Sequence, residues 1–131
     1  MRSHATATFK VKTWDEKPYN ESPKLTRASV QYEYHGDVEG DAFSESLMVY
    51  GQDGSASYVT VDRIVGTLGG KAGSFVLQGS GTYSATVGEA KWTAFVVPGS
   101  ATGDLRGLRG NAEFSATHIP PGTFTLDYEF E

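Results

Sequence analysis

The sequence predicts an all-β fold, a single closed antiparallel barrel of eight or nine strands, with a β-sandwich as the alternative. Three observations predict it. Glycine is frequent, with 16 among 131 residues, and β-branched and aromatic residues fill the segments between glycines, as in strands joined by turns. No segment repeats its apolar residues at helical spacing. Both ends of the chain alternate apolar and polar residues, which is typical of strands with one buried and one solvated face.

The terminal strands carry the clearest alternation. One face of the segment 123–131 holds Phe124, Leu126, Tyr128 and Phe130. One face of the segment 5–12 holds Ala5, Ala7, Phe9 and Val11. Because both ends of the chain lie in strands, we expect the sheet to close by pairing its first strand with its last.

The intervening strands are expected near 25–35, 38–50, 56–67, 72–79, 81–87, 90–97 and 111–117. Asp53-Gly54 and Gly69-Gly70 supply the positive φ of tight hairpins, and 79–81 (Gly-Ser-Gly) is interpreted as a plain turn. Two longer connections are expected at 15–23 and 98–110. A barrel of about eight strands has room inside for side chains or for one small ligand.

Composition excludes several classes of function. The net charge is −5 and the 11 Lys and Arg residues are scattered, whereas nucleic-acid binding needs a concentrated positive face. There is no cysteine, which excludes disulfides and thiolate metal sites. No apolar stretch is long enough to span a membrane or resembles a signal peptide. The lipid face of an outer-membrane barrel could not carry the charges of Lys10, Lys12, Asp127 and Glu129.

These absences lead us to expect a cytoplasmic protein of one domain, residues 1–131, with no nucleic-acid or membrane partner. The sequence leaves open whether it forms a homodimer. The three histidines, His4, His35 and His118, are not spaced as metal ligands, and no nucleophile elbow opens a helix. The segment 99–103 faintly resembles a phosphate cradle but lacks the following Lys and helix, so we interpret it as a crossover loop. We expect neither a metal nor a cofactor.

Several short sequence words resemble those of a bacterial family, the domain of unknown function 3224, in the same order over nearly the whole chain. They are 9–16 (FKVKTWDE), 25–30 (LTRASV), 36–40 (GDVEG), 66–78 (GTLGGKAGSFVLQ), 97–110 (VPGSATGDLRGLRG) and 125–128 (TLDY). The resemblance implies a barrel of the allene-oxide-cyclase type, a superfamily that includes plant allene oxide cyclase and dirigent proteins. No general activity is attached to the family.

Two positions depart from the family pattern. Gly79 follows Gln78 where many members have a histidine, and Ser46 precedes Leu-Met where many have a tyrosine. Both changes replace a ring with a small residue, so we expect them to enlarge the lumen.

Polar residues within the predicted strands are the candidates for chemistry. Asp62 and Arg63 are adjacent, so alternation sends one of them into the barrel. If Asp62 faces inward it is a carboxyl group among rings and aliphatic side chains, where burial suits it to act as a general acid or base. Arg27 could pair with it or polarise a carbonyl group. Each of these residues could instead form an outward salt bridge or satisfy buried backbone groups.

The expected function is the binding of a mostly apolar small molecule in the lumen. Any catalysis would be a cofactor-free isomerisation or cyclisation, with Asp62 and Arg27 as the catalytic residues. The candidate binding residues are Trp14, Glu16, Glu45, Ser46, Tyr50, Tyr58, Gln78, Gly79 and Trp92, although the aromatic ones could simply pack the core. A non-catalytic carrier or sensor, and a structural or partner-binding domain with a filled barrel, are the alternatives.

Overall fold

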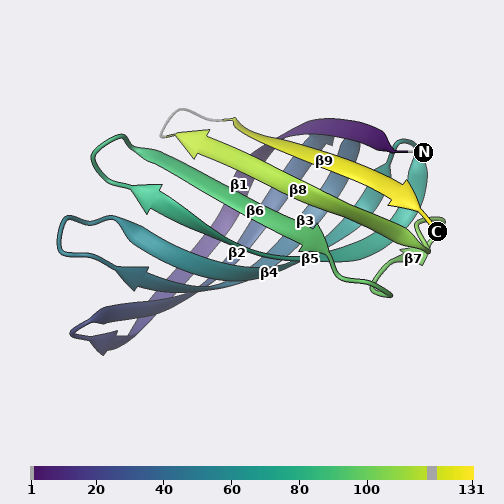
Figure 1. Cartoon of the computed structure of the whole chain (residues 1–131). Coiled ribbons are helices and arrows are strands. Elements are labelled where there is room, and N and C mark those ends of the chain that lie inside the picture. The colour runs from purple at the N-terminus through teal and green to yellow at the C-terminus, as the bar shows by residue number, and fades with distance from the viewer. Residues whose placement is uncertain (1, 118–120) are drawn as a thin grey trace.

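A computed structural model of the chain describes residues 2–117 and 121–131. That part contains nine strands and no helix that could cross a membrane. The strands are β1 (Ser3–Glu21), β2 (Lys24–Gly36), β3 (Val38–Tyr50), β4 (Ala56–Leu68), β5 (Lys71–Ser84), β6 (Glu89–Val96), β7 (Thr102–Gly103), β8 (Leu108–Thr117) and β9 (Gly122–Phe130). Eight of them form a closed antiparallel ring, and the two-residue β7 pairs with β5 outside it (Figure 1). The predicted barrel is confirmed.

The ring closes between the first and last strands, as the alternation at both ends predicts. β9 pairs with β1 from Ser3↔Tyr128 to Phe9↔Gly122 and with β8 on its other side. The pairing of β4 with β5 joins the two halves of the sheet. Phe124 and Leu126 are fully buried and Tyr128 packs against the core, so the predicted inner face is correct as far as Tyr128. Phe130, at the end of the strand, is exposed.

The two ends of the barrel differ. The hairpins that join β1 to β2, β3 to β4 and β5 to β6 lie together at one end, and the chain termini and β7 lie at the other (Figure 1). At the terminal end, large apolar side chains fill the interior: Tyr34, Val38, Leu68, Phe75, Leu105, Leu108 and Phe124 are all nearly inaccessible. The barrel is therefore packed at the terminal end, and what space remains lies toward the hairpins.

The prediction of a loop at 15–23 is wrong, because β1 continues as a strand to Glu21 and pairs with β2 down to Lys24. This long hairpin reaches beyond the rest of the barrel wall in Figure 1. Its residues are mostly polar and exposed, which hid the strand from an argument based on apolar alternation. Pairing with β2 satisfies the backbone N–H and C=O groups of this segment, so it forms a strand without an apolar face.

The expected turn at 79–81 is also wrong, and the two strands predicted around it are the single strand β5. Gly79 and Gly81 lie where the backbone of β6 approaches closely. A Cβ at position 79 would lie 2.2 Å from the carbonyl oxygen of Thr93, and one at position 81 would lie 2.2 Å from that of Lys91. The lack of a Cβ at these two positions therefore lets β6 pack closely against β5, which remains one continuous strand.

The crossover from β6 to β8 completes the edge of β5. The hydroxyl oxygen of Thr102 accepts a hydrogen bond from the backbone N–H of Ser74 at 3.1 Å, and that of Ser100 accepts one from Val76 at 3.1 Å. Leu105, in the same segment, is buried in the packed end of the barrel. The segment therefore connects β6 to β8 while it packs against β5 and the barrel interior, in agreement with its interpretation as a crossover loop.

Candidate functional site in the barrel lumen

The hairpin half of the barrel contains a cavity of about 290 Å³. Its lining side chains come from β1 to β6 and from β8, with Gly54 of the β3–β4 hairpin at one end. The space exists because small side chains occupy the inward positions of β3 and β4 here, namely Ser44, Ser46 and Thr60. Ser46 therefore lines the lumen, as predicted from its small size.

Asp62 lies between the packed half and the hollow half of the barrel. It pairs across β3 and β5 with Ser44 and Leu77, and the next inward residue of β4, Ile64, is fully buried. Asp62 is 2% exposed and lines the cavity, while Arg63 faces solvent. The inward alternative for the Asp62–Arg63 pair is therefore the correct one.

The carboxyl group of Asp62 is incompletely satisfied. Burial raises its pKa to about 6, although a hydrogen bond from the Ser44 side chain opposes the rise. Its Oδ1 is the one buried side-chain oxygen or nitrogen, within residues 2–117 and 121–131, that has no hydrogen-bond partner. A buried polar atom without a partner is rare in folded proteins and calls for an explanation.

Aromatic rings line the same cavity as this carboxyl group. The rings of Phe9, Tyr32, Tyr58 and Phe114 line the cavity, and the centroid of Phe9 lies 5.6 Å from that of Tyr32 and 5.2 Å from that of Phe114. Burial together with the charge of Asp62 raises the pKa of Tyr58 to about 12. Its hydroxyl group donates to the backbone oxygen of Lys91 at 3.2 Å.

Trp92 is a wall of the barrel and does not itself line the cavity. Its ring is fully buried and stacks on Phe114 with a centroid distance of 4.8 Å. Its Nε1 donates to the hydroxyl oxygen of Thr60 at 2.7 Å. Trp92 thereby fixes two side chains that do line the cavity, so its predicted place in the site is indirect.

Glu16 lies at the hairpin end of the cavity and is held by three donors. Trp14 Nε1 donates to its Oε1 at 3.0 Å, Thr26 donates to its Oε2 at 2.6 Å, and the Tyr50 hydroxyl group donates to the same oxygen. Burial alone would raise the pKa of Glu16, but these hydrogen bonds outweigh it and the pKa is lowered. Trp14 and Tyr50 line the cavity, so these three predicted residues form its mouth.

Three other predicted residues lie on the outer face of the barrel, which corrects their placement. The inward positions of β2 are Thr26, Ala28 and Val30, so alternation turns Arg27 outward, where its Nη2 pairs with Glu45 Oε1 at 2.6 Å. Gln78 is outward for the same reason, because Leu77 faces the core. The pairing of Arg27 with Asp62 is therefore absent, since the barrel wall separates them, and the wall separates Gln78 from the lumen in the same way.

Gly79 does not enlarge the lumen as predicted. Gly79 lies at an inward-facing position of β5, but neighbouring atoms already fill the space beside it. A Cβ at position 79 would collide with the backbone of Thr93 and would lie 2.6 Å from the Cβ of Ala94. A larger side chain at position 79 would collide with the neighbouring strand.

A separate groove of about 590 Å³ crosses the outer face of the same wall, where Arg27, Glu45, Gln78 and Gly79 border it. Its floor consists of exposed apolar side chains, including Leu47, Val61 and Phe95. Ser46 borders both spaces. The groove lies on open surface and its charged residues neutralise each other, so it does not combine burial with an unsatisfied polar group as the lumen does.

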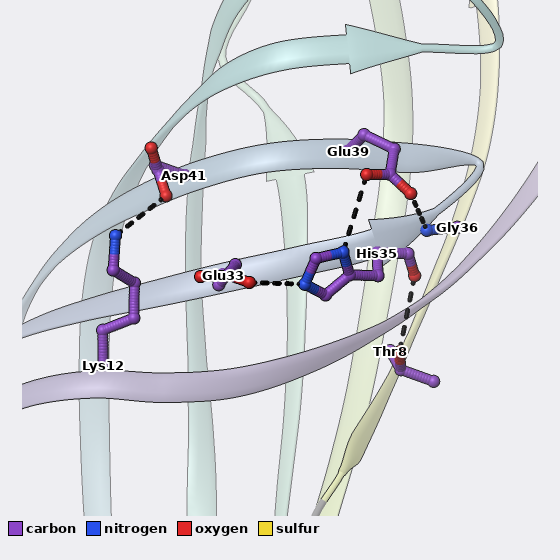
Figure 2. A network of polar contacts seen from close by, with 7 residues as sticks. All are labelled: Thr8, Lys12, Glu33, His35, Gly36, Glu39 and Asp41. Atoms are coloured by element: carbon purple, nitrogen blue, oxygen red, sulfur yellow. Dashed lines mark hydrogen bonds and ion pairs between the residues drawn. The ribbon is translucent and has the colours of Figure 1, made fainter.

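His35 belongs to a network of polar contacts rather than to a group of metal ligands, within the residues that the structure describes. His35 lies on the outer face between Glu33, 2.6 Å from its Nε2, and Glu39, 3.6 Å from its Nδ1 (Figure 2). Glu39 also accepts a hydrogen bond from the backbone N–H of Gly36, so this network braces the β2–β3 turn. His118 lies outside the described residues, and among those that are described no three His, Asp or Glu residues are grouped to hold a metal.

Sequence reasoning missed several lining residues, among them Tyr32, Ser44 and Phe114. Tyr32 was detectable, because the alternation Val30, Tyr32, Tyr34 continues the inner face of β2. Ser44 was not, since its importance comes from lying opposite Asp62 on the neighbouring strand. That pairing depends on register, which the sequence does not display.

Comparison with known proteins identifies the family. A family model described as "Protein of unknown function (DUF3224)" matches residues 5–128. The chain belongs to the DUF3224 family. No curated protein matches the chain in sequence.

A solved DUF3224 structure has the same fold. It is the crystal structure of a protein of unknown function from Shewanella oneidensis MR-1, with 28% sequence identity and a TM-score of 0.80. The similarity covers 100% of this chain and 99% of that one. The barrel is therefore shared with another DUF3224 protein over its whole length, and the comparison brings no activity with it.

Proposed function

We propose that the barrel binds a small, mostly apolar molecule in its lumen and that the Asp62 carboxyl group anchors it. The observation that carries this proposal is the unpartnered Oδ1 of Asp62 at an aromatic-lined cavity. Small-molecule sites combine apolar and aromatic walls with a few placed polar groups. A ligand that donates a hydrogen bond to Oδ1 would satisfy the oxygen that the protein leaves alone.

The volume of the cavity limits the size of this ligand. At about 290 Å³ it lies near the lower end of typical ligand pockets, which span about 300–1,000 Å³. It is roughly twice an apolar cavity of about 150 Å³ that holds benzene. We therefore expect a ligand of one or two rings.

A purely structural barrel accounts less well for the cavity and for the unsatisfied Asp62 carboxyl group than a binding site does. A filled core would leave no cavity, and an apolar residue in place of Asp62 would avoid the cost of an unsatisfied buried carboxyl group. Retaining both a cavity and such a group is what a binding site requires.

A second candidate function is a cofactor-free isomerase or cyclase, and the pKa of Asp62 favours it. A carboxyl group with a pKa of about 6 can exchange a proton with a bound ligand near neutral pH. The resemblance to barrels of the allene-oxide-cyclase type supports this candidate by analogy of fold alone. Turnover of a bound ligand that is lost in Asp62→Asn would distinguish the enzyme from a carrier or sensor.

Blocking the lumen tests the binding proposal. Indole, a neutral two-ring probe, should shift the amide NMR signals of Tyr32, Ser44 and Tyr58 in the wild type. Ser46→Phe places a ring in the cavity and should abolish these shifts. Leu47→Phe is the matched control, because residue 47 is the adjacent position of β3 and faces outward. An absence of shifts in the wild type, or shifts that survive Ser46→Phe, would contradict the proposal.

A further inference from the structure

The described residues that line the lumen carry negative charge and no positive charge. Asp62 is an acid and none of the lining residues is a Lys, Arg or His. Glu16 adds a second carboxylate at the mouth through its bonds to Trp14 and Tyr50. Lys24 lies close enough to Glu16 to lower its pKa, so a cation already accompanies the carboxylate at the mouth. Asp62 has no such cation beside it among the described residues that line the lumen.

The groups that face Asp62 do not neutralise it. Ser44 donates a hydrogen bond, and the tyrosines within its electrostatic reach are Tyr32, Tyr34 and Tyr58. Arg27 lies on the other side of the wall, paired with Glu45. A buried charge without a partner is costly, and a cation inside the cavity would offset that cost through direct attraction in a poorly screened environment.

The aromatic lining suits a cation as well. The faces of aromatic rings attract ammonium groups through their quadrupoles, most strongly where water is excluded. The charge of Asp62 helps to raise the pKa of Tyr32 and Tyr58, so its field reaches these rings. At the mouth, the ammonium group of Lys24 already lies 4.7 Å from the ring centroid of Tyr50. Rings of this barrel thus accept an ammonium group in the protein itself.

We propose that the ligand of the lumen is an organic cation, a one- or two-ring apolar compound bearing a protonated amine that donates to Asp62 Oδ1. This inference rests on the proposed function and adds the charge of the ligand. The apolar part packs against Phe9, Tyr58 and Phe114, and the ammonium group lies beside Asp62 among the rings. An anionic ligand would meet uncompensated negative charge instead. A bare metal ion would find one carboxylate and hydroxyl groups, which is fewer charged ligands than such ions take.

Three probes that share a phenylethyl group and differ in charge test this inference. They are 2-phenylethylamine, which is protonated at neutral pH because alkylamines titrate near 10, its neutral isostere propylbenzene, and the anion 3-phenylpropanoate. Amide chemical shifts give the dissociation constant of each at about pH 7.5, where Asp62 is ionised. We expect the amine to bind at least about tenfold more tightly than propylbenzene, and the anion to bind most weakly.

Two variants locate the origin of this preference. Asp62→Asn removes the charge while keeping the shape, so the amine should lose its advantage while propylbenzene still binds. Glu45→Gln removes one negative charge from the outer face and should leave the preference unchanged. A further measurement needs no variant, because saturating amine should lower the pKa of Asp62 and propylbenzene should not.

The outcomes separate this inference from the proposed function. If propylbenzene or the anion binds as tightly as the amine, or if Asp62→Asn keeps the preference, the organic-cation inference is overturned and lumen binding still stands. If none of the three probes, nor indole, binds the wild type, both proposals are overturned.

Discussion

Asp62 carries its charge among inward-facing apolar side chains, and this position makes the stability of the fold depend on pH. Its pKa rises from 3.8 to about 6 on folding, so the folded state binds this proton more tightly than the unfolded state does. Its contribution to stability is then fully present below the unfolded pKa and is lost as pH rises through about 6. Two pKa units correspond to about 3 kcal/mol.

Asp62→Asn should remove this loss. We expect the variant to gain unfolding free energy relative to the wild type as pH rises from about 4 to about 7, by up to about 3 kcal/mol. Urea unfolding of both proteins at several pH values measures the difference, in which the other titrating groups cancel. A difference that stays constant across this range would show that Asp62 is not a buried acid.

Glu45→Gln is the control for this experiment. Hydrogen bonds from Ser29 and Arg27 lower the pKa of Glu45, so its contribution has the opposite sign and is lost as pH falls. The difference between Glu45→Gln and the wild type should therefore show no gain above pH 4, unlike that of Asp62→Asn.

At the scale of secondary structure, the contact between β5 and β6 depends on glycine. Gly79→Ala should destabilise the barrel by about 1–3 kcal/mol, as overpacking does, because its Cβ would lie 2.2 Å from a backbone oxygen that cannot move independently. Gly51→Ala is the control, since the nearest atom there belongs to the flexible side chain of Asp53 at 3.3 Å. Thermal or urea unfolding of the two variants gives the comparison, and equal small effects would contradict this account of the strand contact.

The strands show what alternation in the sequence can and cannot predict. Where a strand has one apolar face, as β9 does, alternation located both the strand and its inner face. It failed for the outer part of β1, where both faces are wet and pairing with β2 holds the strand, and at Gly79, where glycine serves packing rather than a turn. Local pattern reports burial, and it does not report which backbone lies next to a residue.

In the whole molecule, the barrel wall divides the predicted site residues into a set that faces the lumen and a set that faces outward. The sequence indicated that Asp62 or Arg63 faced inward, and it identified Trp14, Glu16, Ser46, Tyr50 and Tyr58 around the same space. It placed Arg27, Glu45 and Gln78 there too, because the face of an isolated polar residue depends on strand parity that a mixed pattern leaves undecided. The closed ring then separates residues that are near each other on neighbouring strands but on opposite faces of the sheet.

Closure of the ring buries an unpaired carboxyl group beside a hollow lumen. NMR titration of the Asp62 carboxyl carbon in the ligand-free wild type measures the burial of this group. We expect a pKa of about 6. A pKa near the ordinary aspartate value of about 3.9 would mean that solvent or a cation satisfies the group, and would contradict its burial without a partner.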